Sequence, residues 1–374
     1  MIELKKIALE FINLIENSGY KAYIVGGFVR DFLMKKESYD IDITTNATPK
    51  EIQKIFSSVT VKRPINDEDN YGSVRVVYKN IIFEVTTFRK ELEYLDNRHP
   101  SRIFYVDDLE TDLKRRDFTI NAICMDKNSN IIDPLQGKLD IQNKIIRTIA
   151  PSEASFKDDA LRILRAIRFM VTLNFKFHPD IIIAIKKTKQ YLKNISYERK
   201  KIELDKIFAS PYAKRGIEII KELELEEALD LKNLDRIQDY TDLIGIWAMI
   251  NSDSYRFTRH EKELIKKVNI VYEMDNLDPK VLYKYGLYVN ILAGINKGIN
   301  KKRIIKAYSN LPIKSKNDIK VTAKEICLLL NKQPSYFLQD IYRQLEDLIL
   351  TGKLENENDI LLTYIQKNFK EIYI

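Results

Sequence analysis

The pattern of hydrophobic residues changes near residue 147, and this change constrains the fold more than any other feature of the sequence. Before it, short runs such as 74–78 and 81–88 have the composition and the bounding turn residues of β-strands. Beyond it there is almost no strand-like alternation, and hydrophobic residues recur at helical spacing. The 374 residues include only 11 glycines and 10 prolines, which favours long helices over a turn-rich β fold. The sequence therefore predicts an α+β region that closes near residue 146, followed by an all-α remainder.

Individual elements can be predicted in both regions. In the first, we expect a helix at 3–17, a strand at 22–25, a helix that opens at Pro49, and a hairpin formed by 74–78 and 81–88. Residues 89–113 are polar and charged, and we predict a long loop there, of a kind that is often functional or mobile. In the remainder, helices are predicted at 157–171, from the cap Ser196 to residue 208, at 335–350 and at 357–369.

A phosphate and metal site is predicted just after the first strand-like run. Gly26 and Gly27 have no side chains, so backbone N–H groups there can approach an anion closely. Asp40 and Asp42 are two residues apart, and in a strand such residues point to the same face. Paired carboxylates suit Mg²⁺, which completes its shell with water and substrate phosphates. Alone, each fragment is more often a turn or a helix cap, but together they indicate phosphoryl or nucleotidyl transfer.

Two further segments of the first region carry charged residues of interest. Glu84 lies inside the second strand of the hairpin, where it either faces solvent or, if this strand neighbours the aspartate strand, supplies a third carboxylate. The run 115–122 begins with Arg115 and Arg116, a pair that could hold a triphosphate while ordering nearby carboxylates. The alternative for this run is a capped helix start with exposed arginines.

The predicted helix 157–171 has one apolar face and one charged face. On a wheel of about 100° per residue, its apolar residues fall within an arc of about 120°. On the opposite side, at successive i,i+3 positions, lie Asp159, Arg162, Arg165 and Arg168. Such a face is usually only solvated, but three arginines with few matching acids indicate anion or nucleotide binding.

Composition limits the partners and the compartment. The net charge of +8 fits a nucleic-acid partner. Cys124 and Cys327 lie far apart without metal-ligand spacing, which predicts a reducing compartment. No run approaches the roughly 18 apolar residues that a membrane span needs. The first 17 residues are interpreted as a structural helix, not a targeting peptide. We therefore expect a cytoplasmic protein with no membrane partner.

Three motifs occur in a fixed order along the chain. Gly-Gly-x-Val-Arg-Asp begins at Gly26 and is followed by the Asp-x-Asp of Asp40 and Asp42; Arg-Arg-Asp-Phe-Thr-Ile-Asn-Ala spans 115–122; Asp-x-x-Arg-x-x-Arg-x-x-Arg-Phe spans 159–169. Each motif is weak alone, but all three in order closely resemble the class II tRNA nucleotidyltransferase (CCA-adding enzyme) and bacterial poly(A) polymerase family, within the polymerase-β-like nucleotidyltransferases. The resemblance covers Gly26 to about residue 208.

The resemblance implies both an architecture and an activity. The architecture is an α+β head of the polymerase-β-like nucleotidyltransferase fold at 1–146, a helical neck with a nucleobase-selecting helix at 147–210, a helical body at 211–305, and a helical tRNA-binding tail at 306–374. The activity is template-independent addition of CCA to the 3′ end of tRNA from CTP and ATP, with release of pyrophosphate.

The resemblance also implies roles for particular residues. Asp40 and Asp42 would hold two Mg²⁺ ions, with Glu84 as a further candidate catalytic carboxylate. The triphosphate would be bound by Gly26, Gly27, Arg30 and Arg116. The base would be selected by Asp159 and Arg162, with Arg165 and Arg168 supporting them or the phosphates. The family often has Glu before this Asp, whereas this chain has the shorter Asp158.

The proposed selection has a physical basis. A carboxylate can accept from the exocyclic amine that cytosine and adenine share, and a guanidinium can donate to the adjacent ring nitrogen. Guanine and uracil present a carbonyl and an N–H at these positions, so both contacts would be mismatched.

Several alternatives stay open at this point. The segment 89–113 is retained, whereas CC-adding members are shortened there, and the Gly-basic-basic-Phe signature of poly(A) polymerases is not found after Asp42. CCA addition is therefore preferred over A-adding, CC-adding or poly(A) activity, although the segment does not separate it from A addition. A non-catalytic RNA-binding protein would be expected to lose the paired carboxylates. The sequence does not indicate the oligomeric state.

Overall fold

The computed structural model describes residues 2–57, 61–62, 72–94 and 100–370. Its contacts divide the chain into two units, Met1–Asp230 and Leu231–Ile374. The predicted division into head, neck, body and tail stays a prediction. Among the described helices, none is long and apolar enough to span a bilayer.

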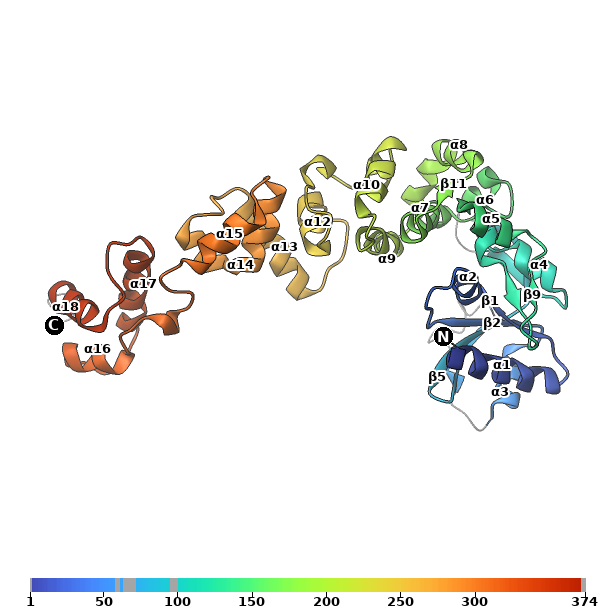
Figure 1. The fold of residues 1–374 in the computed structure, drawn as a ribbon, viewed down its shortest axis with the longest axis horizontal. Coiled ribbons are helices and arrows are strands. Elements are labelled where there is room, and N and C mark those ends of the chain that lie inside the picture. The colour runs from blue at the N-terminus through green and yellow to red at the C-terminus, as the bar shows by residue number, and fades with distance from the viewer. Residues whose placement is uncertain (1, 58–60, 63–71, 95–99, 371–374) are drawn as a thin grey trace. The chain divides into compact units, whose positions relative to one another are not determined.

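The first unit contains a mixed β-sheet (Figure 1). Within the described residues the strand order is β3-β4-β5-β2-β1-β8-β9. β2 and β5 run parallel, and the other neighbouring pairs run antiparallel. The strands are β1 (Ala22–Val25), β2 (Ile41–Thr45), β3 (Val61–Lys62), β4 (Ser73–Tyr78), β5 (Ile81–Thr87), β8 (Cys124–Met125) and β9 (Ile131–Ile132). The predicted first strand and hairpin are confirmed.

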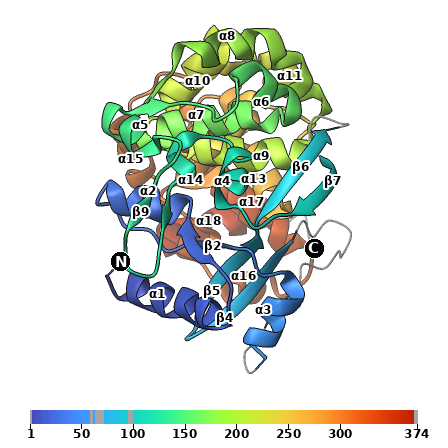
Figure 2. The same cartoon turned by 90° about the vertical axis from the view of Figure 1, so that its right-hand side faces the viewer.

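The two faces of the sheet have different neighbours (Figures 1 and 2). One face is covered by α1 (Ile2–Asn17) and α3 (Pro49–Ile55), and the other carries α2 (Gly27–Leu33). On the first face, Phe11 stacks on Phe56 at 4.5 Å and on Phe83 at 4.2 Å between ring centroids. Because strand side chains alternate, the neighbours of Phe83 and Ile43 in sequence, Glu84 and Asp42, point to the opposite face.

The segment predicted as a loop at 89–113 is mostly regular structure, so that prediction was wrong. It forms β6 (Arg89–Tyr94), β7 (Pro100–Tyr105) and α4 (Leu109–Lys114). The two strands pair with each other in a separate antiparallel ribbon, visible at the right of Figure 2. A two-stranded ribbon needs no continuous hydrophobic face, and its polar sequence therefore carried little strand signal. Residues 95–99 lie outside the described residues.

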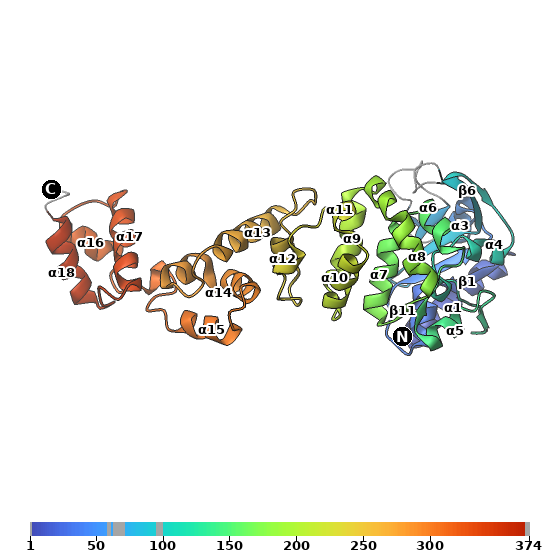
Figure 3. The same ribbon diagram turned by 90° about the horizontal axis from the view of Figure 1, so that it is seen from above.

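The rest of the first unit is mainly helical. The helix predicted at 157–171 is in fact two helices, α6 (Ser152–Asp158) and α7 (Leu161–Leu173), because Asp159 has the extended backbone angles φ −137° and ψ 103°. α7 packs against α9 and α10 (Figure 3). The remaining α-helices and strands are α5 (Gly137–Asn143), β10 (Ile145–Ile146), β11 (Lys176–Phe177), α8 (Pro179–Thr188), α9 (Tyr197–Phe208), α10 (Ala213–Glu222) and α11 (Glu226–Leu229).

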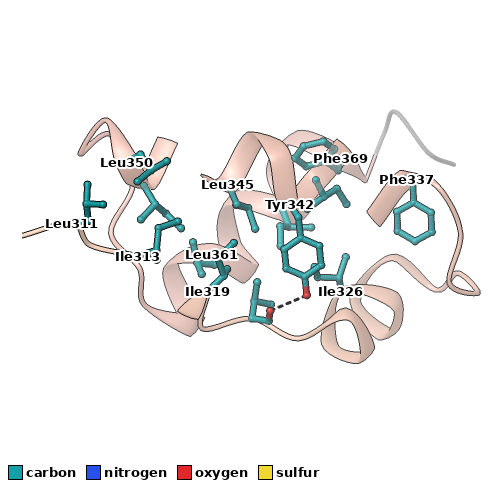
Figure 4. Packing of buried hydrophobic residues seen from close by; sticks show 14 of the residues in the cluster. Leu311, Ile313, Ile319, Ile326, Phe337, Tyr342, Leu345, Leu350, Leu361 and Phe369 are labelled. Carbon is teal, nitrogen blue, oxygen red and sulfur yellow. Dashed lines mark hydrogen bonds between the residues drawn. The ribbon is translucent and has the colours of Figure 1, made fainter. Parts of the chain in front are cut away.

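In the described residues of the second unit all regular secondary structure is helical, and the unit ends in a well-packed cluster. Leu345 and Leu361 are fully buried there, and the Tyr342 hydroxyl donates to the carbonyl oxygen of Val321 at 3.1 Å (Figure 4). The helices are α12 (Leu243–Ile250), α13 (Arg259–Tyr272), α14 (Pro279–Asn296), α15 (Lys301–Ser309), α16 (Ala323–Leu330), α17 (Phe337–Leu350) and α18 (Asn358–Phe369). The last two match the helices predicted at 335–350 and 357–369.

Candidate active site

A polar cavity of about 520 Å³ lies in the first unit, at the start of α2 and beside β2 and α7. Its lining brings together segments that are far apart in the sequence. Among them are the predicted site residues Gly26, Gly27, Arg30, Asp40, Asp42, Arg116, Asp159, Arg162, Arg165 and Arg168. Glu84 is the predicted residue that does not line the cavity. The roles of these residues stay predictions.

Gly26 connects β1 to α2 in a conformation that suits glycine. Its φ of 77° and ψ of −135° lie where L-residues with a side chain are strained. The preceding residue, Val25, is the register partner of Asp42, which places Gly26 beside that aspartate. A Cβ atom at Gly26 would lie 3.4 Å from Asp42 Oδ2. The glycine therefore leaves room next to the carboxylate.

We expect Gly26→Ala to destabilise the protein by about 1–3 kcal/mol and also to raise KM for nucleotides. The matched control is Gly19→Ala, because Gly19 has a φ of 92° and no atom within 4 Å of an added Cβ. Thermal unfolding should reveal strain in both variants, whereas steady-state kinetics should detect a change only at Gly26. Equal KM values in the two variants would contradict a role for Gly26 in the site.

Carboxylates gather at the start of β2. Asp42 and Glu84 are direct register partners in β2 and β5. The strand of Glu84 therefore neighbours the aspartate strand, which was the condition for Glu84 to supply a third carboxylate. Asp40 lies one residue before β2, so the strand argument applies only to Asp42, but both aspartates line the cavity. Glu84 forms an ion pair with Arg75 at 3.6 Å.

The electrostatics of this group fit a divalent cation. Desolvation, and then the charge of Glu84, raise the pKa of Asp42 to about 6 even though its side chain is open to the cavity. A bound cation would relieve this repulsion, and carboxylate oxygens are the ligands that hard cations prefer. Within the described residues, no group of three or more His, Cys, Asp or Glu side chains is placed to hold a metal ion. The remaining ligands would therefore come from water and substrate.

Arg30 and Arg116 are held in place by specific partners. Arg30 Nη1 donates to Asn121 Oδ1 at 2.7 Å, and its Nε donates to Asp31 Oδ1 at 2.8 Å. Arg116 Nη2 donates to Asp112 Oδ2 at 3.1 Å. Among the described residues, Arg116 Nε is buried without a hydrogen-bond partner. Two ordered guanidiniums therefore face the region beside Gly26 and Asp42.

Asp112, which the sequence analysis missed, anchors the double arginine. Its fully buried carboxylate accepts from Arg115 Nε at 2.8 Å and from Arg116. It also accepts from the Thr44 hydroxyl in β2 at 3.0 Å and from the Arg89 N–H at the start of β6 at 3.3 Å. Burial alone would raise the pKa of Asp112, but the two guanidiniums hold it below its usual value. The i,i+3 and i,i+4 spacing to Arg115 and Arg116 was the available sequence signal.

The break between α6 and α7 determines how Asp159 and Arg162 lie. Asp159 Oδ1 accepts from the N–H of Leu161, the first residue of α7, at 3.0 Å. Arg162 Nη1 donates to Ser155 Oγ at 2.9 Å, and its Nη2 donates to the Arg115 carbonyl oxygen at 2.9 Å. Both side chains are thereby oriented within the cavity.

Arg165 and Arg168 are each paired with an acid. The sequence analysis had assumed that the arginines of this helix have few acidic partners. Arg165 Nη2 lies 2.6 Å from Asp117 Oδ2, and Arg168 Nη1 lies 3.0 Å from Glu203 Oε2. Burial opposes ionisation of Asp117, but Arg165 and Arg162 outweigh it and lower its pKa to about 2. Arg168 is also buried and not on an exposed face. The acids come from distant segments, so inspection of the helix alone could not identify them.

Comparison with known proteins identifies the family of this chain. Family models match for the Poly A polymerase head domain at 22–147, the RNA- and SrmB-binding site of polymerase A at 174–231, and tRNA nucleotidyltransferase domain 2 at 253–365. The CCA-adding enzyme of Staphylococcus haemolyticus is 34% identical, over 98% of this chain and 99% of its own length. The chain belongs to the CCA-adding enzyme family. The Bacillus subtilis CCA-adding enzyme is 33% identical, over 94% of this chain and 95% of its own.

A solved structure supports the same family. The crystal structure of the Bacillus stearothermophilus CCA-adding enzyme in complex with CTP has a TM-score of 0.78 and 27% identity, over 99% of this chain and 98% of that one. The predicted family, the nucleotidyltransferase fold class and the enzyme class are therefore confirmed, and membership implies a divalent metal ion. A non-catalytic RNA-binding protein is no longer a competing interpretation.

Proposed function

We propose that this CCA-adding family member adds CCA to the 3′ end of tRNA from CTP and ATP in the cytoplasm. The observation that carries the proposal is one cavity that contains paired carboxylates, ordered guanidiniums and the Asp159–Arg162 pair. These groups match the three parts of the substrate complex, namely the metal, the triphosphate and the base. The relatives that match over nearly the whole chain are named for this activity.

Asp40 and Asp42 would hold Mg²⁺, for which their oxygen ligands and clustered charge are suited. Bound Mg²⁺ supplies activation of the RNA 3′-hydroxyl and charge stabilisation of the pyrophosphate that leaves. Arg30 and Arg116 would bind the triphosphate, and their fixed partners reduce the entropy lost on binding. The backbone beside Gly26 and Gly27 would let the phosphates approach closely.

Asp159 and Arg162 would select the base. The carboxylate can accept from the amine of cytosine or adenine, and each Nη of Arg162 keeps a second N–H beyond the one that contacts Ser155 or Arg115. Guanine and uracil would leave these half-buried groups unpaired beneath the bound base. Arg165 and Arg168, which are already paired with acids, would support the selecting pair.

The direct test uses tRNA that lacks its 3′ CCA, supplied with CTP, ATP or both, followed by sequencing of the products. We expect CC with CTP alone and CCA with both nucleotides. Addition of a single A only to tRNA that already ends in CC would indicate an A-adding enzyme, and growth of a long A tract would indicate a poly(A) polymerase. Either result would overturn the proposal.

We expect Asp159→Ala or Arg162→Ala to reduce the preference for CTP and ATP over UTP and GTP by about 10–100-fold. Each variant removes one of the two proposed hydrogen bonds to the edge of the base. Single-nucleotide incorporation kinetics measure this ratio. Glu198→Ala, at an exposed acid on the neighbouring helix α9, serves as the control. Unchanged selectivity in both site variants would place base selection elsewhere.

A further inference from the structure

Helix α9 presents two charged side chains toward the base-selecting segment. Arg199 and Glu203 are four residues apart, so they lie on the same face of α9, which packs against α7. Glu203 pairs with Arg168, and Arg199 Nη2 lies 3.6 Å from Asp159 Oδ2. Arg199 was not among the residues that the sequence analysis selected.

The two oxygens of Asp159 have different partners. Oδ1 accepts from the Leu161 N–H at 3.0 Å, whereas Oδ2 faces the Arg199 guanidinium. At 3.6 Å this contact is an ion pair and not a hydrogen bond, so Arg199 acts on Asp159 through its charge. Among the described residues, Arg199 Nη1 is buried without a hydrogen-bond partner.

Charge around Asp159 controls whether its carboxyl stays ionised. Burial raises the pKa of Asp159, and Arg199 is the strongest opposing influence, followed by Arg162. Arg165 from α7 also opposes the rise, whereas Asp158 from α6 is a neighbouring acid. Loss of the Arg199 charge would therefore raise the pKa of Asp159 further, and the protonated fraction would grow as the pH falls.

We propose that Arg199 is a positioning residue for base selection, which keeps Asp159 ionised so that this carboxylate can only accept hydrogen bonds. The proposal rests on the proposed function, in which Asp159 reads the exocyclic amine. An ionised carboxylate repels the O4 of uracil and the O6 of guanine. A protonated carboxyl has an O–H that can donate to either oxygen, so the mismatch at this contact disappears.

The test compares Arg199→Gln with Arg199→Lys, which keeps the charge. The control is Lys206→Gln, which removes one positive charge from an exposed position of the same helix. For each variant, kcat/KM is measured for CTP and UTP on tRNA that lacks its CCA end, between about pH 8 and about pH 6. The ratio of the two values cancels pH effects on the chemical step that both nucleotides share.

In Arg199→Gln, we expect the CTP-to-UTP ratio to fall by about 10-fold at neutral pH, and to fall further toward about pH 6. Arg199→Lys, Lys206→Gln and the unaltered protein should keep a high ratio with little pH dependence. A merely structural loss would lower both kcat/KM values together and leave their ratio and its pH profile unchanged, which would overturn the proposal.

Asp159→Ala, alone and combined with Arg199→Gln, separates this inference from the proposed function. If Asp159→Ala relaxes selectivity and Arg199→Gln adds nothing to it, Arg199 acts through Asp159 as proposed. If Asp159→Ala relaxes selectivity while Arg199→Gln alone leaves it unchanged, only the role of Arg199 is wrong. If Asp159→Ala changes nothing, both the assignment of Asp159 and the role of Arg199 are overturned.

Discussion

Replacing Asp42 with asparagine is expected to reduce nucleotide incorporation by about a thousandfold or more, the largest effect in this protein. The amide keeps the size of the side chain but removes the negative charge that would hold the divalent cation. Glu84, the register partner of Asp42, cannot replace the lost carboxylate because it does not line the cavity. Single-turnover incorporation of CMP into tRNA measures the loss.

Binding of tRNA to the Asp42→Asn variant should stay close to normal, because RNA affinity depends on phosphate and shape contacts over a larger surface. Glu37→Gln is the matched control, since it removes one exposed carboxylate between α2 and β2. Full turnover in the Asp42 variant, or an equal loss in both variants, would contradict the metal assignment.

Asp112→Asn is expected to lower the free energy of unfolding by about 3–5 kcal/mol. The substitution leaves the Arg115 and Arg116 guanidiniums without the buried carboxylate that both contact. It also weakens the hydrogen bond that the Thr44 hydroxyl of β2 donates to the side chain at position 112. Denaturant unfolding measures the stability, and KM for CTP and ATP should rise together because Arg116 loses its anchor.

The matched control for Asp112 is on the same helix. Glu110→Gln breaks an exposed i,i+4 ion pair with Lys114, and such pairs contribute only about 0.3–0.5 kcal/mol. Folding lowers the pKa of Asp112, so its contribution is present above the unfolded-state pKa of about 3.9 and is lost as the pH falls below it. A stability loss no larger than that of Glu110→Gln would contradict the anchoring role.

Elements that are marked by short sequence signals, such as a turn or a helix cap, were predicted correctly. The turn at Lys79 and Asn80 joins two runs with strand composition, and both residues adopt the positive φ angles that a tight hairpin requires. The helix at Pro49 begins with a capping box between Thr48 and Glu51. The ribbon of β6 and β7 escaped prediction because the sequence at 89–94 is mostly polar and charged and lacks the hydrophobic alternation of a half-buried strand.

The residue types of the candidate site could be predicted from short sequence motifs, but the orientation of Asp159 could not. The wheel through 157–171 treated Asp159 as helical, whereas its extended backbone ends α6 and its carboxylate accepts from the N–H of Leu161, the first residue of α7. This break directs the carboxylate differently from a side chain on a continuous helix. No rule of helical periodicity indicates where such a break occurs when no Pro or Gly marks it.

The sequence by itself determined the family, the kind of chemistry and most of the residues that line the cavity, because three motifs supply the carboxylates and guanidiniums in order. Only the tertiary structure decided which charges compensate one another. Asp112 and Glu203 pair with arginines across packed elements, and Arg199 reaches Asp159 from another helix. The physical reason is that charge interactions depend on distance in space and on burial, neither of which follows from separation along the chain.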